Sequence, residues 1–509
     1  MDGNERLLIT GGRVFRHGGN VHHPTVADVL IEGDRITKIE TGLADTGGVP
    51  AESVIDARDK LVIPGLVDTH YHSHDVLLKG SFEALPLDTW MINALLPSYP
   101  KRSTEEVRAR TLMGAAELIH SGVTTVQDML TFFPFSEEHL DTVMQAYADI
   151  GIRVVFAMQV GDRTGLDAVP YWKEVVPEKY HSYLASFVAP FEDATPLEVV
   201  TEQYRRLRDY NERITWALAP SIPQLCSTEL LEGLGELSDA EGLQIFTHNC
   251  DGKSFTLADR TRYADHDGSS VKYLHDIGLL GPRMGLVHSI WVRQDEIELM
   301  AETGTHVSLV PAGNLKTKSG VAPFRGYLDA GVSIGLGTDN SSNGDAQNMF
   351  HVMKFFTGLA AVCHPDPGPP SAEETLRIST SGGAEVLGLK DEVGDLQPGM
   401  KADVTILDLT NLNFVPLNSV TRQLVFTESG QSVETVIVDG RVVMRDRKLV
   451  TIDEGELRDA VEVVMPGLIK DRDAVSDRIA EIQSYLLEAW RKTQAHDLGM
   501  QRYVGDGSG

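Results

Sequence analysis

The sequence predicts an α/β protein in which a (β/α)8 TIM barrel is joined to a small composite β-sandwich domain formed from both chain ends. Two observations favour this fold. In the middle of the chain, short β-branched runs alternate eight times with amphipathic helical stretches. Near opposite ends, residues 27–40 and 433–446 share one strand–turn–strand pattern. Strands that alternate with helices form parallel βα units, and eight such units close into a barrel.

The strands of the terminal domain are predicted from these two hairpin patterns. Residues 27–40 (ADVLIEGDRITKIE) contain a Gly-Asp turn, and residues 433–446 (VETVIVDGRVVMRD) contain an Asp-Gly turn, which is a strong hairpin signal. Residues 402–409 (ADVTILDL) add a strand before the second hairpin. We therefore expect residues 1–62 and 396–455 to form one composite β-sandwich.

The barrel is expected to span residues 63–395. Amphipathic segments such as residues 104–122 and 294–304 separate its strands. An open, doubly wound sheet fits less well, because no glycine-rich phosphate loop follows the first strand. The eight predicted strands are residues 66–70, 123–128, 153–160, 214–220, 243–249, 284–289, 306–311 and 332–339.

After residue 453 the pattern becomes helical. An apolar stripe at three- and four-residue spacing is formed by Val475, Ile479, Ile482, Leu486 and Trp490. Such a stripe packs most often on its own domain, and a contact between subunits is the alternative. We expect residues 456–509 to be a C-terminal helical extension whose last residues, 504–509, are disordered.

The composition of the chain indicates which kinds of binding partner and substrate to expect. The 509 residues carry a formal net charge of −29, which disfavours phosphate backbones and anionic membrane surfaces. No run approaches the roughly 18 apolar residues of a membrane span, and no secretory signal is evident. The 3 cysteines are far apart and indicate no disulfide framework. We expect a cytoplasmic homo-oligomer with a small-molecule substrate, binding neither nucleic acid nor membrane.

The strongest functional signal is the position of polar residues at the predicted strand ends. His70 and His72 end the first strand, and strand alternation points both side chains to one face. His248, His288 and Asp339 end the fifth, sixth and eighth strands. The carboxyl ends of barrel strands meet at one mouth, where active sites are found. One such histidine is more often a packing residue, but five groups at one mouth predict a site for a divalent ion such as zinc.

Several motifs resemble those of the amidohydrolase superfamily, in the branch that includes cytosine deaminase, S-adenosylhomocysteine deaminase and the triazine chlorohydrolases. The resemblance covers the chain to about residue 455. Its motifs are PGLVDTHYH (64–72), GVTTVQDM (122–129), GLLGPRMGLVHSIWV (278–292), AETGTHVSLVPAGNLKTKSGVAP (301–323), AGVSIGLGTDN (330–340) and LQPGMKADVTILD (396–408).

The resemblance implies which residues hold the metal. It places ligands at His70, His72, His248 and Asp339, and it implies that His288 contacts the metal-bound water or the substrate. Relatives with two metals bridge them by a carboxylated lysine on the fourth strand, but the strand ends ALAPSIP and FAMQVGD offer none. We therefore expect one divalent metal ion, zinc first, with iron, manganese or cobalt as alternatives.

One departure from the branch concerns proton transfer. The deaminases carry a glutamate three residues after the fifth-strand histidine, whereas this chain has Asp251 after His248. Aspartate is shorter by one methylene, and proton transfer needs heavy atoms within about 2.6–3.2 Å. Either Asp251 replaces the glutamate, or the acid role has moved to His288 and Asp339. The neighbouring Cys250 is expected to point away from His248 and not to act as a nucleophile.

Other residues near the strand ends are candidates for substrate contacts. Trp90 follows the first strand and forms either an apolar pocket wall or ordinary loop packing. His74 continues the His-x-His pattern and lies in the pocket, behind it or at the surface. Gln159, Asn314 and Asp128 stand at or just beyond their strand ends.

The first functional hypothesis is hydrolysis of a non-peptide carbon–nitrogen bond in an amide, urea, carbamate or amidine. In it, Asp339 accepts the proton of the attacking water, His288 stabilises the tetrahedral centre, and Asp339 or Asp251 protonates the leaving nitrogen. The alternative is a hydrolytic deaminase or dechlorinase of an N-heterocycle, of triazine, pterin, pyrimidine or purine type. A non-catalytic scaffold is a lesser alternative, because such a relative would have lost metal ligands.

Overall fold

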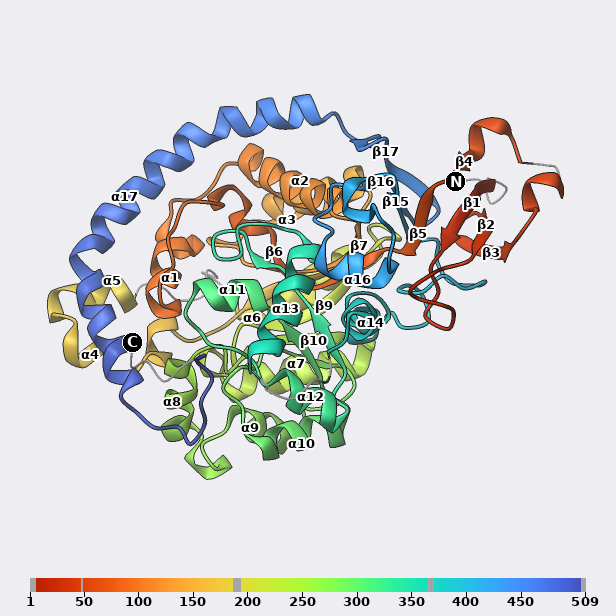
Figure 1. The fold of residues 1–509 in the computed structure, drawn as a ribbon. Coiled ribbons are helices and arrows are strands. Elements are labelled where there is room, and N and C mark those ends of the chain that lie inside the picture. The colour runs from red at the N-terminus through yellow and green to blue at the C-terminus, as the bar shows by residue number, and fades with distance from the viewer. Residues whose placement is uncertain (1–5, 47–48, 186–193, 364–367, 369, 505–509) are drawn as a thin grey trace.

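The computed structural model describes residues 6–46, 49–185, 194–363, 368 and 370–504, and it contains two large sheets. One sheet is parallel and lies in the middle of the chain, where helices surround it (Figure 1). The other combines strands from both ends of the chain and lies to one side of the first. The predicted barrel with a composite β domain is therefore confirmed.

The parallel sheet contains all eight predicted strands. The eighth is split at residues 337–338 into β13 and β14, and β14 pairs with β6 to close the ring. In chain order the strands are β6 (Leu66–His72), β7 (Val123–Leu130), β8 (Arg153–Val160), β9 (Ile214–Pro220), β10 (Gln244–Asn249), β11 (Met284–His288), β12 (His306–Leu309), β13 (Ile334–Leu336) and β14 (Asp339–Asn340).

Close packing against β6 explains the split. A Cβ atom on Gly337 would lie 2.7 Å from the carbonyl oxygen of His70, so only glycine fits there without movement of the backbone. The next residue, Thr338, donates its hydroxyl to Asp68 Oδ2 at 2.6 Å and its amide to Asp68 Oδ1 at 3.2 Å. These bonds anchor the chain on β6 just before Asp339, which pairs with Tyr71.

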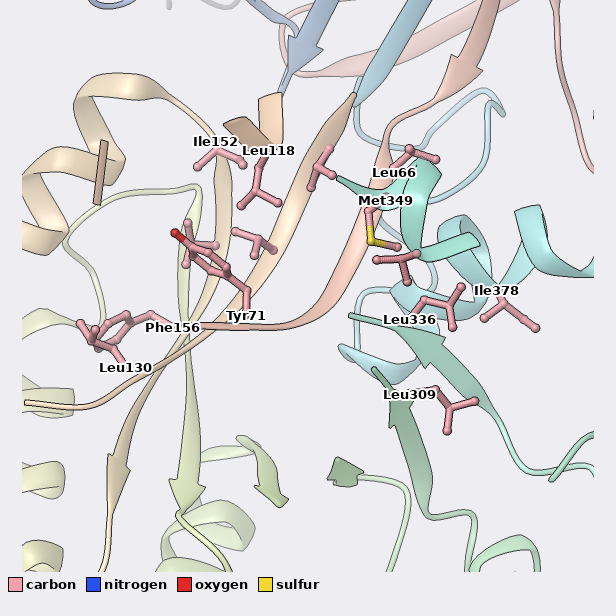
Figure 2. Packing of buried hydrophobic residues seen from close by; sticks show 14 of the residues in the cluster. Leu66, Tyr71, Leu118, Leu130, Ile152, Phe156, Leu309, Leu336, Met349 and Ile378 are labelled. Carbon is pink, nitrogen blue, oxygen red and sulfur yellow. The ribbon is translucent and has the colours of Figure 1, made fainter. Parts of the chain in front are cut away.

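The core lies between the outer face of the barrel and its helices. Figure 2 shows Tyr71, Phe156 and Leu118 of α2 among the buried side chains of this core. Tyr71 points away from the barrel axis, because it alternates with His70 and His72 along β6. Gly114 of α2 leaves room for the Tyr71 ring, since a Cβ atom there would overlap the Tyr71 hydroxyl.

The helices that follow the strands complete this layer. Among the described residues, none of them is both long and apolar enough to cross a membrane. They are α1 (Leu87–Ala94), α2 (Thr104–His120), α3 (Glu137–Ile150), α4 (Trp172–Val175), α5 (His181–Ala185), α6 (Pro196–Leu207), α7 (Thr228–Glu241), α8 (Lys253–Arg262), α9 (Ser270–Asp276), α10 (Gln294–Thr303), α11 (Pro311–Lys316), α12 (Phe324–Ala330), α13 (Met349–Cys363), α14 (Ala372–Arg377), α15 (Gly383–Val386) and α16 (Val420–Phe426).

The strands from the two chain ends form one continuous sheet in the order β18-β17-β16-β15-β5-β1-β2-β3, with β4 paired to β1. Both predicted hairpins are present, as β2–β3 and β16–β17, and β15 pairs with β5 to join the two ends. The strands are β1 (Arg6–Val14), β2 (Val26–Glu32), β3 (Arg35–Glu40), β4 (Val54–Asp56), β5 (Lys60–Pro64), β15 (Val404–Asp408), β16 (Val433–Val438), β17 (Arg441–Arg445) and β18 (Lys448–Leu449).

A single long helix, α17 (Glu454–Gln494), follows the composite sheet and arches over one side of the barrel past α2 and α1 (Figure 1). Its predicted apolar stripe packs on the same chain, with Val475, Ile479, Ile482 and Leu486 buried and Trp490 partly exposed. The stripe covers α1 and α4, which follow β6 and β8. Most of the tail expected to be disordered, residues 505–509, lies outside the described residues.

Candidate active site

The five polar groups predicted at strand ends do meet at one end of the barrel. His70 and His72 come from β6, His248 from β10, His288 from the end of β11, and Asp339 from the start of β14. Two triplets have ligand atoms within 4.8 Å of one another, namely His70, His72 and Asp339, and His70, His248 and His288. All five side chains are buried or nearly so, which places the cluster at the bottom of a pocket.

The spacing of the donor atoms is narrow. The Nε2 atoms of His72 and His248 are 3.4 Å apart. Oδ1 of Asp339 lies 3.5 Å from Nε2 of His70 and 3.5 Å from Nε2 of His72. Two ligands of a tetrahedral zinc ion, each about 2.0–2.1 Å from it, lie about 3.3–3.4 Å apart. The donor spacing therefore matches that of a small tetrahedral cation.

Hydrogen bonds fix which ring nitrogens face inward. His72 donates its Nδ1 proton to the carbonyl of Met129 at 2.5 Å, and His248 donates its Nδ1 proton to the carbonyl of Ser221 at 2.7 Å. In the neutral rings the facing Nε2 atoms are therefore unprotonated lone pairs, which repel at 3.4 Å. Among the described residues, His70 has no hydrogen-bond partner for either buried ring nitrogen. A cation between these side chains would accept the nitrogen lone pairs that face it and would remove their repulsion.

The charges of the cluster suit metal ligation. Burial lowers the pKa of His70 to about 4, and burial together with the neighbouring histidines lowers the pKa values of His72 and His248 to about 3. The imidazoles are thus neutral near pH 7. Burial alone would raise the pKa of Asp339, but the nearby imidazoles of His70, His288 and His72 hold it well below its usual range. Three neutral imidazoles and one carboxylate are a ligand set that zinc prefers.

His288 is held from the side opposite the cluster. Its Nδ1 atom is 2.9 Å from Oδ1 of Asn314, which accepts the proton, so Nε2 faces the other histidines. The backbone around the site is strained, because His288, Ser289, Cys250 and Asp339 have φ values of 65°, 46°, 44° and 68°. A left-handed conformation costs a residue with a side chain of order 1–3 kcal/mol, and such strain clusters at functional sites.

Asp251 lies in the same pocket, just after β10. It is buried, and among the described residues its Oδ1 has no hydrogen-bond partner. Burial, followed by the charge of Asp88, raises the pKa of Asp251 to about 8. Asp88 on α1 is itself bonded to Ser254 on α8, at 2.7 Å. Asp251 is therefore a neutral acid at pH 7 that presents a free oxygen to the pocket.

The pocket has an apolar wall and a polar floor. Trp90 of α1 belongs to the wall and donates its indole proton to Ser342 Oγ at 3.1 Å. No lysine or arginine is among the described residues that line the pocket. The apolar lining comprises Leu87, Trp90, Met91, Leu95, Ile222, Leu225 and Phe255, and the polar lining beyond His72, His248, His288 and Asp339 includes His74, Gln159, Ser221, Asp251, Asn314, Thr317, Ser319, Asn340 and Asn343.

Of the proposed substrate contacts, four line the pocket and one does not. Trp90, His74, Gln159 and Asn314 face it. His74 is buried in the wall, where the amide of Thr131 approaches its Nδ1 at 3.4 Å, so it does not lie at the surface. Asp128 is directed away from the pocket and accepts hydrogen bonds from Ser73 and Tyr147, because it stands on the outer face of β7.

Cys250 also points away from the site, as expected, with its sulfur 3.7 Å from Ser270 Oγ. The sequence analysis offered Trp90 as a wall residue but missed the rest of the apolar wall, and it missed Asn343, whose amide donates to Asp339 Oδ2 at 2.9 Å. The spacing of Asn343, four residues after Asp339, was the available signal. The carbonyls of Met129 and Ser221, which set the histidine tautomers, leave no signal in the sequence.

Comparison with known proteins shows the family and the fold. The model of the amidohydrolase family matches residues 61–443. A 5'-deoxyadenosine deaminase of Methanothermobacter thermautotrophicus is 31% identical over 468 residues, covering 91% of this chain and 99% of the relative. A 5-methylthioadenosine/S-adenosylhomocysteine deaminase of Thermococcus onnurineus is 33% identical over 445 residues, covering 87% of this chain and 95% of the relative.

Solved structures share the architecture. A zinc-bound adenosine deaminase from Xanthomonas campestris has a TM-score of 0.78 at 24% identity and covers 93% of this chain and 99% of its own. An atrazine chlorohydrolase from Arthrobacter aurescens in complex with zinc has a TM-score of 0.78 at 24% identity and covers 90% of this chain and 100% of its own. At 24% identity, the similarity to these two structures shows a shared fold and nothing further.

Proposed function

The chain belongs to the amidohydrolase family, and we propose that it uses one divalent metal ion to remove the exocyclic amino group of a neutral aminopurine nucleoside by hydrolysis. Hydrolysis of a carbon–nitrogen bond other than a peptide bond is the activity of the related deaminases. For the substrate we choose a heterocycle, which was the alternative hypothesis above, and not an amide or urea. The reason is that the similar enzymes act on adenosine derivatives.

The metal is proposed to be zinc, held by His70, His72, His248 and Asp339. The observation that carries this proposal is the 3.4–3.5 Å spacing of the donor atoms, in which the facing Nε2 atoms of His72 and His248 have no proton between them to relieve their repulsion. A metal bound there lowers the pKa of a water ligand from 15.7 to about 7, which supplies a nucleophile near neutral pH. Two of the solved structures with a similar fold contain zinc. Iron, manganese and cobalt are the alternatives.

The chain's own residues move the protons. Asp339 remains ionised and can accept a proton from the attacking water. His288, neutral because burial lowers its pKa, presents its unprotonated Nε2 to the same water. It orients the nucleophile and, once protonated, stabilises the negative charge that develops at the ring. Asp251 is protonated at pH 7 and can donate to the ring nitrogen next to the carbon under attack. Asp339 then passes the proton it took from the water to the exocyclic nitrogen, the carbon–nitrogen bond breaks and ammonia leaves, and the proton of the added hydroxyl returns to Asp251 as the carbonyl forms.

The lining of the pocket favours a neutral substrate. The described lining has no cationic side chain to pair with a phosphate or carboxylate, while the ionised carboxylate of Asp339 repels an anion. Residues 186–193, which lie outside the described residues, contain no lysine or arginine in the sequence. Trp90 and Phe255 offer aromatic surface to a purine ring, and Met91 and Leu95 offer an apolar wall to a substituent. We therefore favour nucleosides over nucleotides.

The test is ammonia release by zinc-loaded enzyme from adenosine, 5'-deoxyadenosine, 5'-methylthioadenosine and adenosine monophosphate. We expect turnover of the three neutral nucleosides, with kcat/KM for the monophosphate lower by about tenfold or more. His70→Ala should lose both metal and activity. The proposal is wrong if a preparation with one metal per chain releases no ammonia from any aminopurine.

A second candidate function is hydrolysis of an amide, urea or carbamate. The observation that favours it is Asp251, which is shorter than the glutamate of the deaminase branch and has less reach toward a ring nitrogen. A parallel panel of small amides, ureas, carbamates and chlorinated triazines distinguishes the candidates by which class gives product. Three further features stay proposals: the domain boundaries given above, a cytoplasmic location and a homo-oligomeric state. Native mass measurement tests the last.

A further inference from the structure

The segment after α17 returns to the mouth of the barrel, although it lies beyond the residues that match the family model. Arg502 donates Nε to the carbonyl of Ile290 at 2.8 Å and Nη2 to the carbonyl of Val292 at 2.7 Å. Its own carbonyl accepts a hydrogen bond from the amide of Val321 at 2.7 Å. One residue of the tail thus binds two loops that follow barrel strands.

The first of these loops begins at His288. Its amides are already bound on the inner side: Ser289 N–H donates to the carbonyl of Asn249 at 2.9 Å, and Ile290 N–H donates to that of Cys250 at 3.0 Å. Asn249 and Cys250 are the two residues between His248 and Asp251. Arg502 therefore binds carbonyl groups of the loop after β11, while amide groups of the same loop connect the ends of β10 and β11.

The second loop belongs to the pocket lining. Trp291 donates its indole proton to the carbonyl of Ser319 at 2.7 Å, and the Tyr503 ring meets the Trp291 ring edge-on with centroids 5.2 Å apart. Ser319 and Thr317 line the pocket, and Asn314 of α11, just before this loop, holds His288. The C-terminal tail consequently supports both His288 and Asn314, the residue that orients the His288 ring.

The strained backbone explains why bracing is needed. Cys250, His288 and Ser289 all have left-handed φ values of 44°, 65° and 46°. Strained conformations of this kind persist only where the surrounding structure fixes them. The guanidinium of Arg502 fixes two carbonyls at once through bonds from a charged donor, which are stronger than neutral ones.

We propose that Arg502 is a positioning residue for the active site, which keeps the loop after β11 in the conformation that aims His288 at the reacting water. Its effect on turnover rests on the function proposed above, whereas its effect on the backbone does not. The C-terminal extension in this way contributes to the active site, and the barrel needs it to hold the loop after β11 in place.

The substrate-independent test is hydrogen exchange, measured by mass spectrometry on peptides that cover residues 284–292. In full-length Arg502→Gln we expect faster exchange of these amides than in the wild type. The matched control is Arg491→Gln, which changes an exposed arginine near the end of α17. Wild-type exchange in Arg502→Gln would overturn the proposal, whatever the substrate of the enzyme proves to be.

The kinetic test separates positioning from general stability. For Arg502→Gln we expect kcat to fall roughly 10- to 100-fold while KM changes by less than about threefold, with one metal per chain retained. Arg502→Lys, which can bind one carbonyl at a time, should be intermediate, and guanidinium ion in the buffer should restore part of the activity of Arg502→Ala. Unchanged kcat, or a loss that only tracks lost metal or unfolded protein, contradicts the proposal. If no aminopurine is turned over even by the wild type, the proposed function fails and the exchange result alone decides.

Discussion

At Asp251 the chain differs from the glutamate of the deaminase branch, and the surroundings of this side chain support the acid role proposed for it. The side chain is buried and unpaired at Oδ1, and the charge of Asp88 adds to the effect of burial. Both favour the protonated acid. A protonated carboxyl can donate at neutral pH, which is what the departure of a poor leaving group requires. The shorter side chain then determines which substrates bring a nitrogen within its reach.

The activity should depend on the protonation of Asp251. Its pKa is about 8 in the folded protein and 3.8 without perturbation, so the group is protonated below about pH 8 and loses its proton above it. We expect kcat/KM to fall as the pH rises through about 8. In Asp251→Asn this alkaline decline should disappear and the plateau should be lower by roughly 100-fold or more. A pH–rate profile from pH 5 to 10 measures both.

The same shift predicts the pH dependence of stability. Between about pH 4 and 8 the folded chain retains a proton at Asp251 that the unfolded chain has lost, so the free energy of unfolding falls as the pH rises through this window. Asp251→Asn removes this contribution, whereas Asp265→Asn, at an exposed carboxylate, should keep it. An alkaline decline in activity that survives in Asp251→Asn would assign the ionisation to another group.

At the scale of single residues the sequence predicted more of the metal site than of the pocket. The cluster was predictable because His70, His72, His248, His288 and Asp339 each end a strand, and strand ends of a barrel converge. The wrongly placed candidate, Asp128, also stands near a strand end, but on the face that packs outward against Tyr147.

Among the secondary-structure elements, the junction between β13 and β14 determines where Asp339 stands, because it makes Asp339 the first residue of β14 and not the end of the predicted strand. The chain has to pass close to His70 at Gly337, and Thr338 is then bound to Asp68. The sequence predicted one strand over residues 332–339. It could not predict the break, because the break results from contact with β6, which is more than 200 residues away in the sequence.

Gly337→Ala should disturb this junction. The added methyl group would lie 2.7–2.9 Å from backbone atoms and Cβ of His70, which cannot move aside without displacing a proposed ligand. We expect a loss of about 1–3 kcal/mol in the free energy of unfolding, from urea titrations, together with lower bound metal.

The matched control is Gly358→Ala on α13, where nothing lies within 4 Å of the new methyl group. Because alanine favours a helix interior, this variant should be stabilised by about 0.5–1 kcal/mol. Equal stability and full metal content in Gly337→Ala would show that the junction tolerates movement and that its geometry does not set the position of Asp339.

At the scale of the whole molecule, the long helix α17 and the tail after it flank the barrel. The stripe on α17 was predictable from its spacing, and it packs on α4 and on α1, of which α1 lines the pocket. The contacts of Arg502 were not predictable, because they depend on how the tail returns after the helix ends. The net charge of −29 acts at this scale too, since it disfavours anionic substrates before they reach the pocket.

The central claim is that four side chains from β6, β10 and β14 surround a single cation. Anomalous diffraction at the zinc edge, from crystals of the full chain grown with zinc, tests it most directly. We expect one strong peak per chain, coordinated by Nε2 of His70, His72 and His248 and by a carboxylate oxygen of Asp339. A peak bound elsewhere, a second peak of equal height in the pocket, or no peak between these side chains would contradict the account.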